Sequence, residues 1–350
     1  MIGTLLLNRY EILEKIGEGG MGTVYKGRCV ILDTFVAIKI IKTELNNSQK
    51  FIDRFNREAN LIASLSHPSI VKFYGVGSKG NINFLVMEYV DGKSLRKIIN
   101  EHGRLDPTAA LDIALQTARA LEVAHKNNII HRDVKPDNIL ITRNNKVKLM
   151  DFGLAKGNDS ISMTSSNLII GSAHYFSPEQ ANGHPVDGRT DLYALGIVMY
   201  EMVTGRVPFY GENTMAIIIK HANYPVTPPT DIVNNFPKYF NRVILKCLEK
   251  RPVERFQNAT ELCEALNIVK KSIKESYHAA LNDTNIIRPN LNNKSPKDKY
   301  NETINAYQET KQKANIKDGK TNESWFKKNW KISLVFLAIL IYIYYKNASY

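Results

Sequence analysis

The stretch His131-Arg132-Asp133-Val134-Lys135-Pro136-Asp137-Asn138, followed closely by Asp151-Phe152-Gly153, decides the fold of this chain. Asp133 offers a proton acceptor, and Lys135 can reach a phosphate as a point charge. Asn138 and Asp151 offer hard oxygen atoms of the kind that bind magnesium. Each residue alone is more often a turn-capping residue, but the ordered set indicates transfer of a phosphoryl group to a hydroxyl.

A glycine-rich segment lies nearer the N-terminus. Residues 17–24 read Gly-Glu-Gly-Gly-Met-Gly-Thr-Val, a GxGxxGxV pattern between two predicted strands, and glycines there let backbone amides approach phosphates. A dinucleotide site would place a helix after the glycines, whereas a second strand is predicted here. Lys39 lies inside the apolar strand predicted over residues 35–41, where a buried ammonium needs a carboxylate partner. Glu58, on a helix predicted over residues 50–65, is the expected partner.

These motifs and their order resemble those of the eukaryotic-like (Hanks-type) serine/threonine protein kinases, and membrane-anchored bacterial ones in particular, over residues 10–268. The resemblance implies an α+β fold of two lobes, with a β-rich N-lobe over 10–87, a hinge at 88–92 and a helical C-lobe over 93–268. It implies an enzyme that moves the γ-phosphoryl group of ATP to Ser/Thr hydroxyls of protein substrates, with Mg²⁺, or Mn²⁺, as cofactor. A scaffold of the same fold without turnover and a small-molecule phosphotransferase are the alternatives.

The resemblance also assigns residues. Asp133 and Lys135 are expected to be catalytic, Asn138 and Asp151 to bind the metal, and Met87 to be the gatekeeper. The residues expected at ATP are Ile16, Gly17, Gly19, Gly22, Val24, Ala37, Lys39, Glu58, Glu88, Val90 and Leu140, with the backbones of Glu88 and Val90 meeting adenine.

Further matches concern support and regulation. Glu179, in Ser177-Pro178-Glu179, is expected to pair with Arg255, and Asp191 to brace the catalytic loop. Lys135 together with Ser172 is typical of serine/threonine kinases. Arg132 precedes the catalytic Asp133 and has no further acid built in beside it, so a phosphate on the loop between Asp151 and Glu179 would give its guanidinium a partner. Thr164 and Ser166 are the expected sites of autophosphorylation.

The C-terminal part changes character. Residues 269–324 are polar and predicted to be a flexible linker. Residues 332–345 carry no charge and have aromatic residues and lysines at their flanks, which favours a transmembrane helix over residues 330–346. This run is shorter than the roughly 20 residues of an ideal span, so an interfacial or buried helix is the alternative. We expect a single-pass C-terminal anchor with the kinase domain in the cytoplasm.

Composition sets wider bounds. The chain has 350 residues, is 43% hydrophobic and carries a formal charge of +13. Because Lys and Arg are spread along it without a basic stripe, no nucleic-acid partner is expected. The cysteines, Cys29, Cys247 and Cys263, form no CxxC pair and indicate reduced, packed thiols. No secretory signal opens the chain. A homodimer that phosphorylates itself in trans is a possible assembly.

Overall fold

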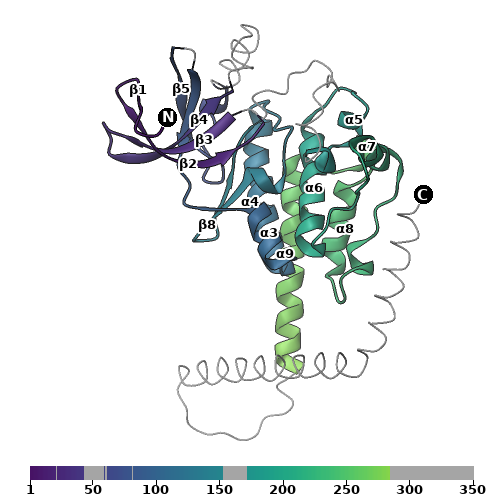
Figure 1. Ribbon diagram of the computed structural model, residues 1–350. Helices are drawn as coiled ribbons and strands as arrows, with labels where there is room; N and C mark the ends of the chain where they lie inside the picture. Colours follow the sequence, from purple (N-terminus) through teal and green to yellow (C-terminus); the bar gives the residue numbers. More distant parts are fainter. Residues whose placement is uncertain (21, 43–58, 60, 81, 153–171, 284–350) are drawn as a thin grey trace, which may run out of the picture. The chain divides into compact units, whose positions relative to one another are not determined.

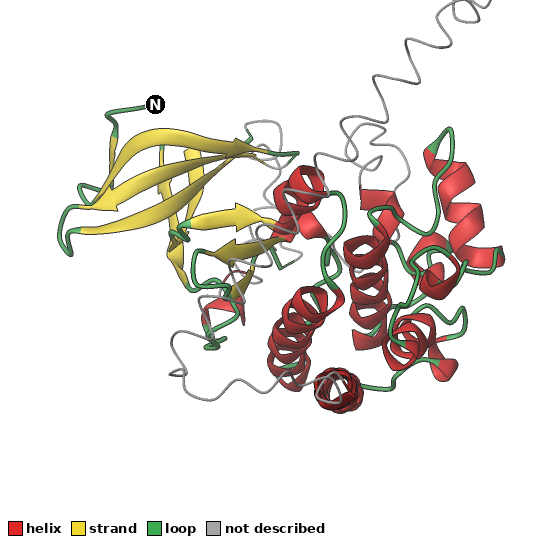
Figure 2. Ribbon diagram, turned by 90° about the horizontal axis from the view of Figure 1, so that it is seen from below, coloured by secondary structure: helices red, strands yellow, loops and turns green. Residues whose placement is uncertain are grey.

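The computed structural model describes residues 1–20, 22–42, 59, 61–80, 82–152 and 172–283 (Figure 1). Residues 1–279 form one compact unit. Figure 2 shows that its strands gather on one side and its helices on the other. This arrangement matches the two lobes that the sequence predicts.

The N-lobe is an antiparallel sheet whose strands follow the order β1-β2-β3-β4-β6-β5. Side chains of β4 and β6 on one face, such as Ile38 and Val86, belong to a buried cluster with Leu6 and Ile12. Alternate residues of the same strands, such as Ala37, belong to a second cluster that faces the helical part. The strands are β1 (Leu5–Leu6), β2 (Tyr10–Glu18), β3 (Gly22–Cys29), β4 (Thr34–Ile41), β5 (Phe73–Lys79) and β6 (Ile82–Glu88).

The C-lobe holds the remaining described elements. A three-stranded sheet contains β7 (Gly92–Ser94), β8 (Ile139–Thr142) and β9 (Val147–Leu149). The helices are α3 (Leu95–His102), α4 (Pro107–Lys126), α5 (Pro178–Ala181), α6 (Gly188–Thr204), α7 (Thr214–Asn223), α8 (Lys238–Cys247) and α9 (Ala259–Asp283). Short 3₁₀ helices span Pro136–Asn138, Ser172–Tyr175, Pro229–Asp231 and Pro252–Glu254.

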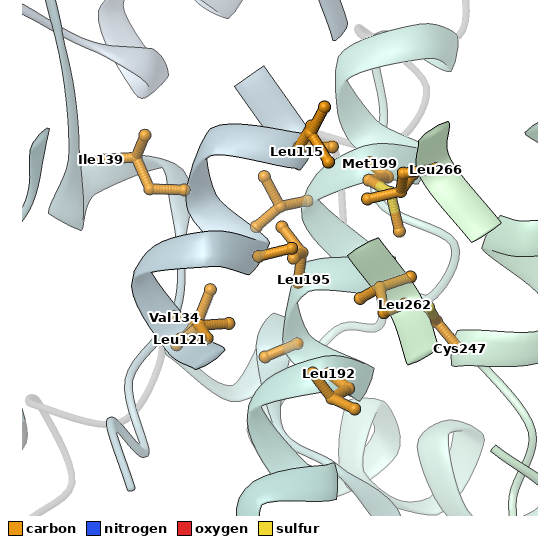
Figure 3. Packing of buried hydrophobic residues seen from close by; sticks show 14 of the residues in the cluster. Leu115, Leu121, Val134, Ile139, Leu192, Leu195, Met199, Cys247, Leu262 and Leu266 are labelled. Atoms are coloured by element: carbon orange, nitrogen blue, oxygen red, sulfur yellow. The ribbon is translucent and has the colours of Figure 1, made fainter. Parts of the chain in front are cut away.

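Helix α6 forms the centre of the C-lobe core. Its residues from Thr190 to Val203 are all buried, so this helix is surrounded by protein on every side. Figure 3 shows Leu192, Leu195 and Met199 of α6 between side chains of α4 and of α9. The long amphipathic stretch from Pro107 to Lys126 predicts a helix, which is confirmed as α4. A second such stretch, from Asp191 to Thr204, predicts the helix observed as α6. It begins earlier, at Gly188, because the side chain of Asp187 caps it by accepting a hydrogen bond from Arg189 N.

The prediction that a flexible linker begins at residue 269 was wrong for its first part. Helix α9 continues to Asp283. Val269 is buried and Ile273 packs against the same core, while Lys270 Nζ lies 2.6 Å from Asp112 Oδ1 of α4. Apolar residues spaced four apart therefore extend the packed face of α9 beyond residue 268.

Two further predictions about the C-terminal part fall outside the described residues. They are the rest of the linker, 284–324, and the transmembrane helix over 330–346. Within the ranges that are described, no helix combines the length and apolar character needed to cross a bilayer.

Candidate active site

The catalytic loop is held in place by Asp191, which lies in the first turn of α6. Its Oδ2 accepts hydrogen bonds from His131 N and His125 Nε2, and its Oδ1 accepts one from Arg132 N, all at 2.8 Å. Arg132 has a φ of 63°, which is unfavourable for a long side chain. The bracing role expected of Asp191 is confirmed as geometry.

His131 joins this loop to the strand that leads to Asp151. The side chain is fully buried, and burial lowers the pKa of its imidazole, so the ring is neutral. Nδ1 accepts a hydrogen bond from Asp133 N at 3.2 Å, and Nε2 therefore donates to Met150 O at 2.9 Å. The ring also packs against Phe152, with centroids 4.5 Å apart. One neutral imidazole thus fixes the spacing between Asp133 and Asp151.

Two predicted residues, Lys135 and Asn138, contact the Asp133 carboxylate, and Ser172 holds Lys135. Lys135 Nζ lies 2.8 Å from Asp133 Oδ2 and donates to Ser172 Oγ at 3.0 Å. Asn138 Nδ2 donates to Asp133 Oδ2 at 3.0 Å and to Asp133 O at 2.8 Å. These contacts orient a carboxylate whose side chain is 14% exposed, so a hydroxyl from another molecule can approach it.

Lys39 reaches across from β4 to the opposite lobe. Its Nζ lies 2.7 Å from Asp151 Oδ2, and its side chain is 9% exposed. The expected partner Glu58 lies outside the described residues, so that pairing stays a prediction. The carboxylate that a buried ammonium requires is supplied here by Asp151.

An apolar cavity of about 30 Å³ lies behind these charges. Met87, the predicted gatekeeper, lines it from β6, and Phe152 and Asp151 line it from the other side. The remaining lining residues are Ile62, Val71, Phe73, Leu85 and Met150.

The glycine-rich turn connects β2 and β3, with Gly19 N donating to Gly22 O at 2.9 Å. Among the residues that the structure describes, a Cβ on Gly19 would meet no atom within 4 Å, and on Gly17 it would touch only Val24 Cβ at 4.0 Å. Gly22 differs, because its Cβ would lie 2.0 Å from Ile40 O. Gly17 and Gly19 leave open space for a ligand, whereas Gly22 is required by the strand beside it.

The remaining residues predicted at ATP come from both lobes. Val24 of β3 pairs with Lys39, and Ala37 of β4 is buried in the cluster that Val24 and Val90 also contact. Leu140 lies on β8, paired with Ser94. Ile16 of β2 is 45% exposed.

Two clusters of charged residues lie in the C-lobe outside the catalytic loop. Arg255 Nη1 and Nη2 donate to Glu179 Oε1 and Oε2 at 2.8 and 2.7 Å, as the sequence predicts. Burial raises the pKa of Glu179, but the hydrogen bond and charge of Arg255 outweigh it and hold this pKa below the usual value. The second cluster was not predicted, because no sequence motif marks it; in it Arg96 of α3 contacts Tyr175 and lies 2.5 Å from Glu201 of α6.

The segments that carry the two residues expected to bind a metal, Asn138 and Asp151, are joined by a main-chain hydrogen bond. Met150 N donates to Asn138 O at 2.9 Å, which keeps Asn138 beside the residue that precedes Asp151. An amide and a carboxylate oxygen suit Mg²⁺, which takes its other ligands from phosphates and water. No group of three or more His, Cys, Asp or Glu that could hold a metal occurs in the described part. Thr164 and Ser166 lie outside the described residues.

The profile of the protein kinase domain matches residues 10–267, and the chain belongs to this family. A probable serine/threonine-protein kinase of Clostridium perfringens is 51% identical over 271 residues, 77% of this chain and 40% of that protein. Serine/threonine-protein kinase PrkC of Bacillus subtilis is 43% identical over 263 residues, 75% of this chain and 40% of that protein.

Solved structures agree with the fold. The kinase domain of PknI from Mycobacterium tuberculosis has a TM-score of 0.61 at 25% identity, covering 77% of this chain and 99% of that one. The chain spans about two-fifths of the length of the curated relatives that it matches.

Proposed function

We propose that this chain is a serine/threonine protein kinase that transfers the γ-phosphoryl group of ATP to hydroxyls of protein substrates. The observation that carries this proposal is the arrangement of Lys135 and Asn138 around the Asp133 carboxylate, together with the Lys39–Asp151 ion pair. The relatives named above are serine/threonine kinases.

The residues would divide the work as follows. Asp133 receives the substrate hydroxyl as a hydrogen-bond donor and accepts its proton late in the transfer. Lys135, already held by Asp133 and Ser172, places a positive charge where the phosphoryl group passes. Lys39 holds the phosphates from the β-rich side. Asn138 and Asp151 would hold Mg²⁺, which when bound offsets the charge of the phosphates.

The direct test compares phosphate incorporation from labelled ATP by the full chain and by its Asp133→Asn variant. We expect the variant to lose about 10²- to 10⁴-fold in rate, as removal of a positioned base does. Nucleotide binding is measured in parallel and should persist, since Asp133 is not expected to contact adenine. Nucleotide binding without transfer by the unsubstituted chain would favour the scaffold alternative.

We further propose autophosphorylation between Asp151 and Glu179. Mapping of phosphorylated residues after incubation with ATP should find Thr164 and Ser166, and alanine at both should slow activation. A rate per molecule that rises with protein concentration would support transfer in trans within a homodimer; a constant rate would contradict it.

We also propose that residues 330–346 anchor the chain in a membrane, with the kinase domain on the cytoplasmic side. The support is the uncharged run 332–345 and its flanks of aromatic residues and lysines. Leu337→Lys, near its middle, should release the protein from membranes, because a charge at the bilayer centre costs about 2.5–3.5 kcal/mol. Unchanged membrane association would argue against the anchor.

A further inference from the structure

The side chain of Glu88 joins three segments at the boundary between the lobes. Glu88 is the last residue of β6, and its Oε2 accepts a hydrogen bond from Lys72 N at 3.0 Å. Lys148 Nζ, on β9, lies 2.7 Å from Oε1 and 2.8 Å from Oε2. We call these three residues the Glu88 node. Sequence reasoning assigned only the Glu88 backbone, as a contact for adenine.

The node lies in a half-buried environment. The side chains of Glu88 and Lys148 are 25% and 18% exposed. Water therefore screens this ion pair less than it screens a fully exposed one. Because Lys148 engages both carboxylate oxygens and Lys72 N engages one, the carboxylate has one well-defined orientation.

Main-chain hydrogen bonds connect the same segments that the Glu88 side chain joins. Leu149 N donates to Ser69 O at 2.8 Å, and Val71 N donates to Leu149 O at 2.9 Å. Glu88 N donates to Lys72 O at 2.8 Å. The segment before β5 is thus bonded to β9 on one side and to the end of β6 on the other, and the Lys148–Glu88 pair closes this ring directly.

The position of Lys148 links the node to the chemistry. Lys148 precedes Asp151 on the same short segment, and Met150 between them is held by His131 and Asn138. Glu88 itself is part of the hinge, whose backbone is expected to contact adenine. A nucleotide must meet the hinge and Asp151 at the same time, so its affinity depends on the distance between them.

We propose that Glu88 and Lys148 are positioning residues that fix the hinge relative to the Asp151 segment and thereby set nucleotide affinity and the rate of ADP release. This inference rests on the proposed kinase function. It assigns the Glu88 carboxylate a role separate from any contact of its backbone with adenine.

The test uses the full chain with two single variants and their combination. Lys148→Met keeps the aliphatic stem and removes the charge. Glu88→Gln removes the charge and keeps an oxygen for Lys72 N. Lys93→Met is the matched control, because it breaks a pair with Glu101 of equal length, 2.8 Å, which lies within the C-lobe.

Equilibrium binding of fluorescent ADP and ATP with Mg²⁺ is measured first, followed by the dissociation rate of ADP. We expect each single variant to bind nucleotide about fivefold more weakly and to release ADP correspondingly faster. This is the size of effect expected from the loss of one partly exposed ion pair. The double variant should be no weaker than either single, since both remove the same interaction. The KM for a peptide should not change. Lys148→Arg should restore affinity.

Two results would overturn the inference. One is nucleotide affinity in Lys148→Met equal to that of the unsubstituted chain; a lower melting temperature beside it would mark the pair as structural only. The other is losses that add in the double variant. Failure of the proposed function itself has a different signature, in which the unsubstituted chain and Lys93→Met either bind no nucleotide or bind it without transferring phosphate.

Discussion

Two residues of the site, Arg132 and Asp151, adopt a positive φ, of 63° and 57°. Such a backbone costs of the order of 1–3 kcal/mol for a non-glycine residue and persists only where neighbours determine it. For Arg132 the neighbour is Asp191, which accepts its N–H. A single buried carboxylate on α6 therefore maintains a strained loop that presents Asp133.

Replacement of Asp191 should separate these effects. Asp191→Ala removes the acceptors of three N–H groups, and we expect a loss of about 3 kcal/mol in the free energy of unfolding and at least a hundredfold loss in phosphoryl transfer. Asp191→Asn retains one oxygen acceptor, so its stability and its transfer rate should lie between those of the unsubstituted chain and of Asp191→Ala. Chemical denaturation and a transfer assay measure the two effects; a fully active Asp191→Ala chain would contradict the bracing role.

His221 provides a prediction about pH. It is fully buried on α7, and its Nδ1 lies 3.0 Å from Tyr193 Oη. Burial, with the positive charges of Lys250 and His174, lowers its pKa to about 3. Since the unfolded state takes up a proton below pH 6.5 and the folded state does not, this residue removes stability as pH falls from about 6.5 toward 3.

The measurement is urea denaturation at pH 6.5 and pH 5.0. The unsubstituted chain should lose about 2 kcal/mol more between these values than His221→Gln, which has no titrating group. Equal losses in both chains would contradict the lowered pKa and show that His221 takes up its proton in the folded state, since all other titrating groups are common to the two chains.

At the scale of elements, the β3–β4 pairing depends on Gly22. A Cβ at this position would lie 2.0 Å from Ile40 O of the neighbouring strand. Lys39 directly precedes Ile40 on that strand, β4, and pairs with Val24 of β3. The pairing that places the Lys39 ammonium is therefore sensitive to one hydrogen-to-methyl change.

Gly22→Ala should lower the free energy of unfolding by about 3 kcal/mol and weaken nucleotide binding, because the two strands must separate. Gly19→Ala is the control, with no atom within 4 Å of its new Cβ, and should change stability by less than about 0.5 kcal/mol. Similar melting temperatures for both variants would refute the steric argument.

The sequence predicts those elements and contacts that a local pattern marks. Periodic apolar residues indicate α4, and ordered motifs predict Asp133 with Lys135 and Glu179 with Arg255. It does not predict the Glu88–Lys148 pair, since each is one of many charged residues and their meeting depends on how β6 and β9 are placed. The Arg96–Glu201 pair is not predicted either, because the two residues lie far apart in the sequence.

At the scale of the whole molecule, the two lobes bury apolar surface unequally. Among the described residues, one large cluster connects α4, α6, α8 and α9, whereas the N-lobe has two small clusters. Because burial supplies most folding free energy, local opening should require less energy in the sheet than in the helical lobe.

Hydrogen exchange should therefore be slowest in α6 and faster in β1 and β2. Adding a non-hydrolysable ATP analogue with Mg²⁺ should protect β2 to β4 most, because a ligand at a hundred times its dissociation constant stabilises the bound form by about 2.7 kcal/mol. Uniform exchange across both lobes, with or without nucleotide, would contradict this picture.

The continuation of α9 has a practical consequence for anyone who shortens this protein. A chain cut at residue 268 would end inside a helix, strip Val269 and Ile273 from the core and leave Asp112 without Lys270. Such a fragment would be prone to proteolysis and aggregation because its core is incomplete, whatever the state of its active site. A cut after Asp283 keeps the helix whole, so preparations that stop earlier should not be used to judge whether the enzyme is active.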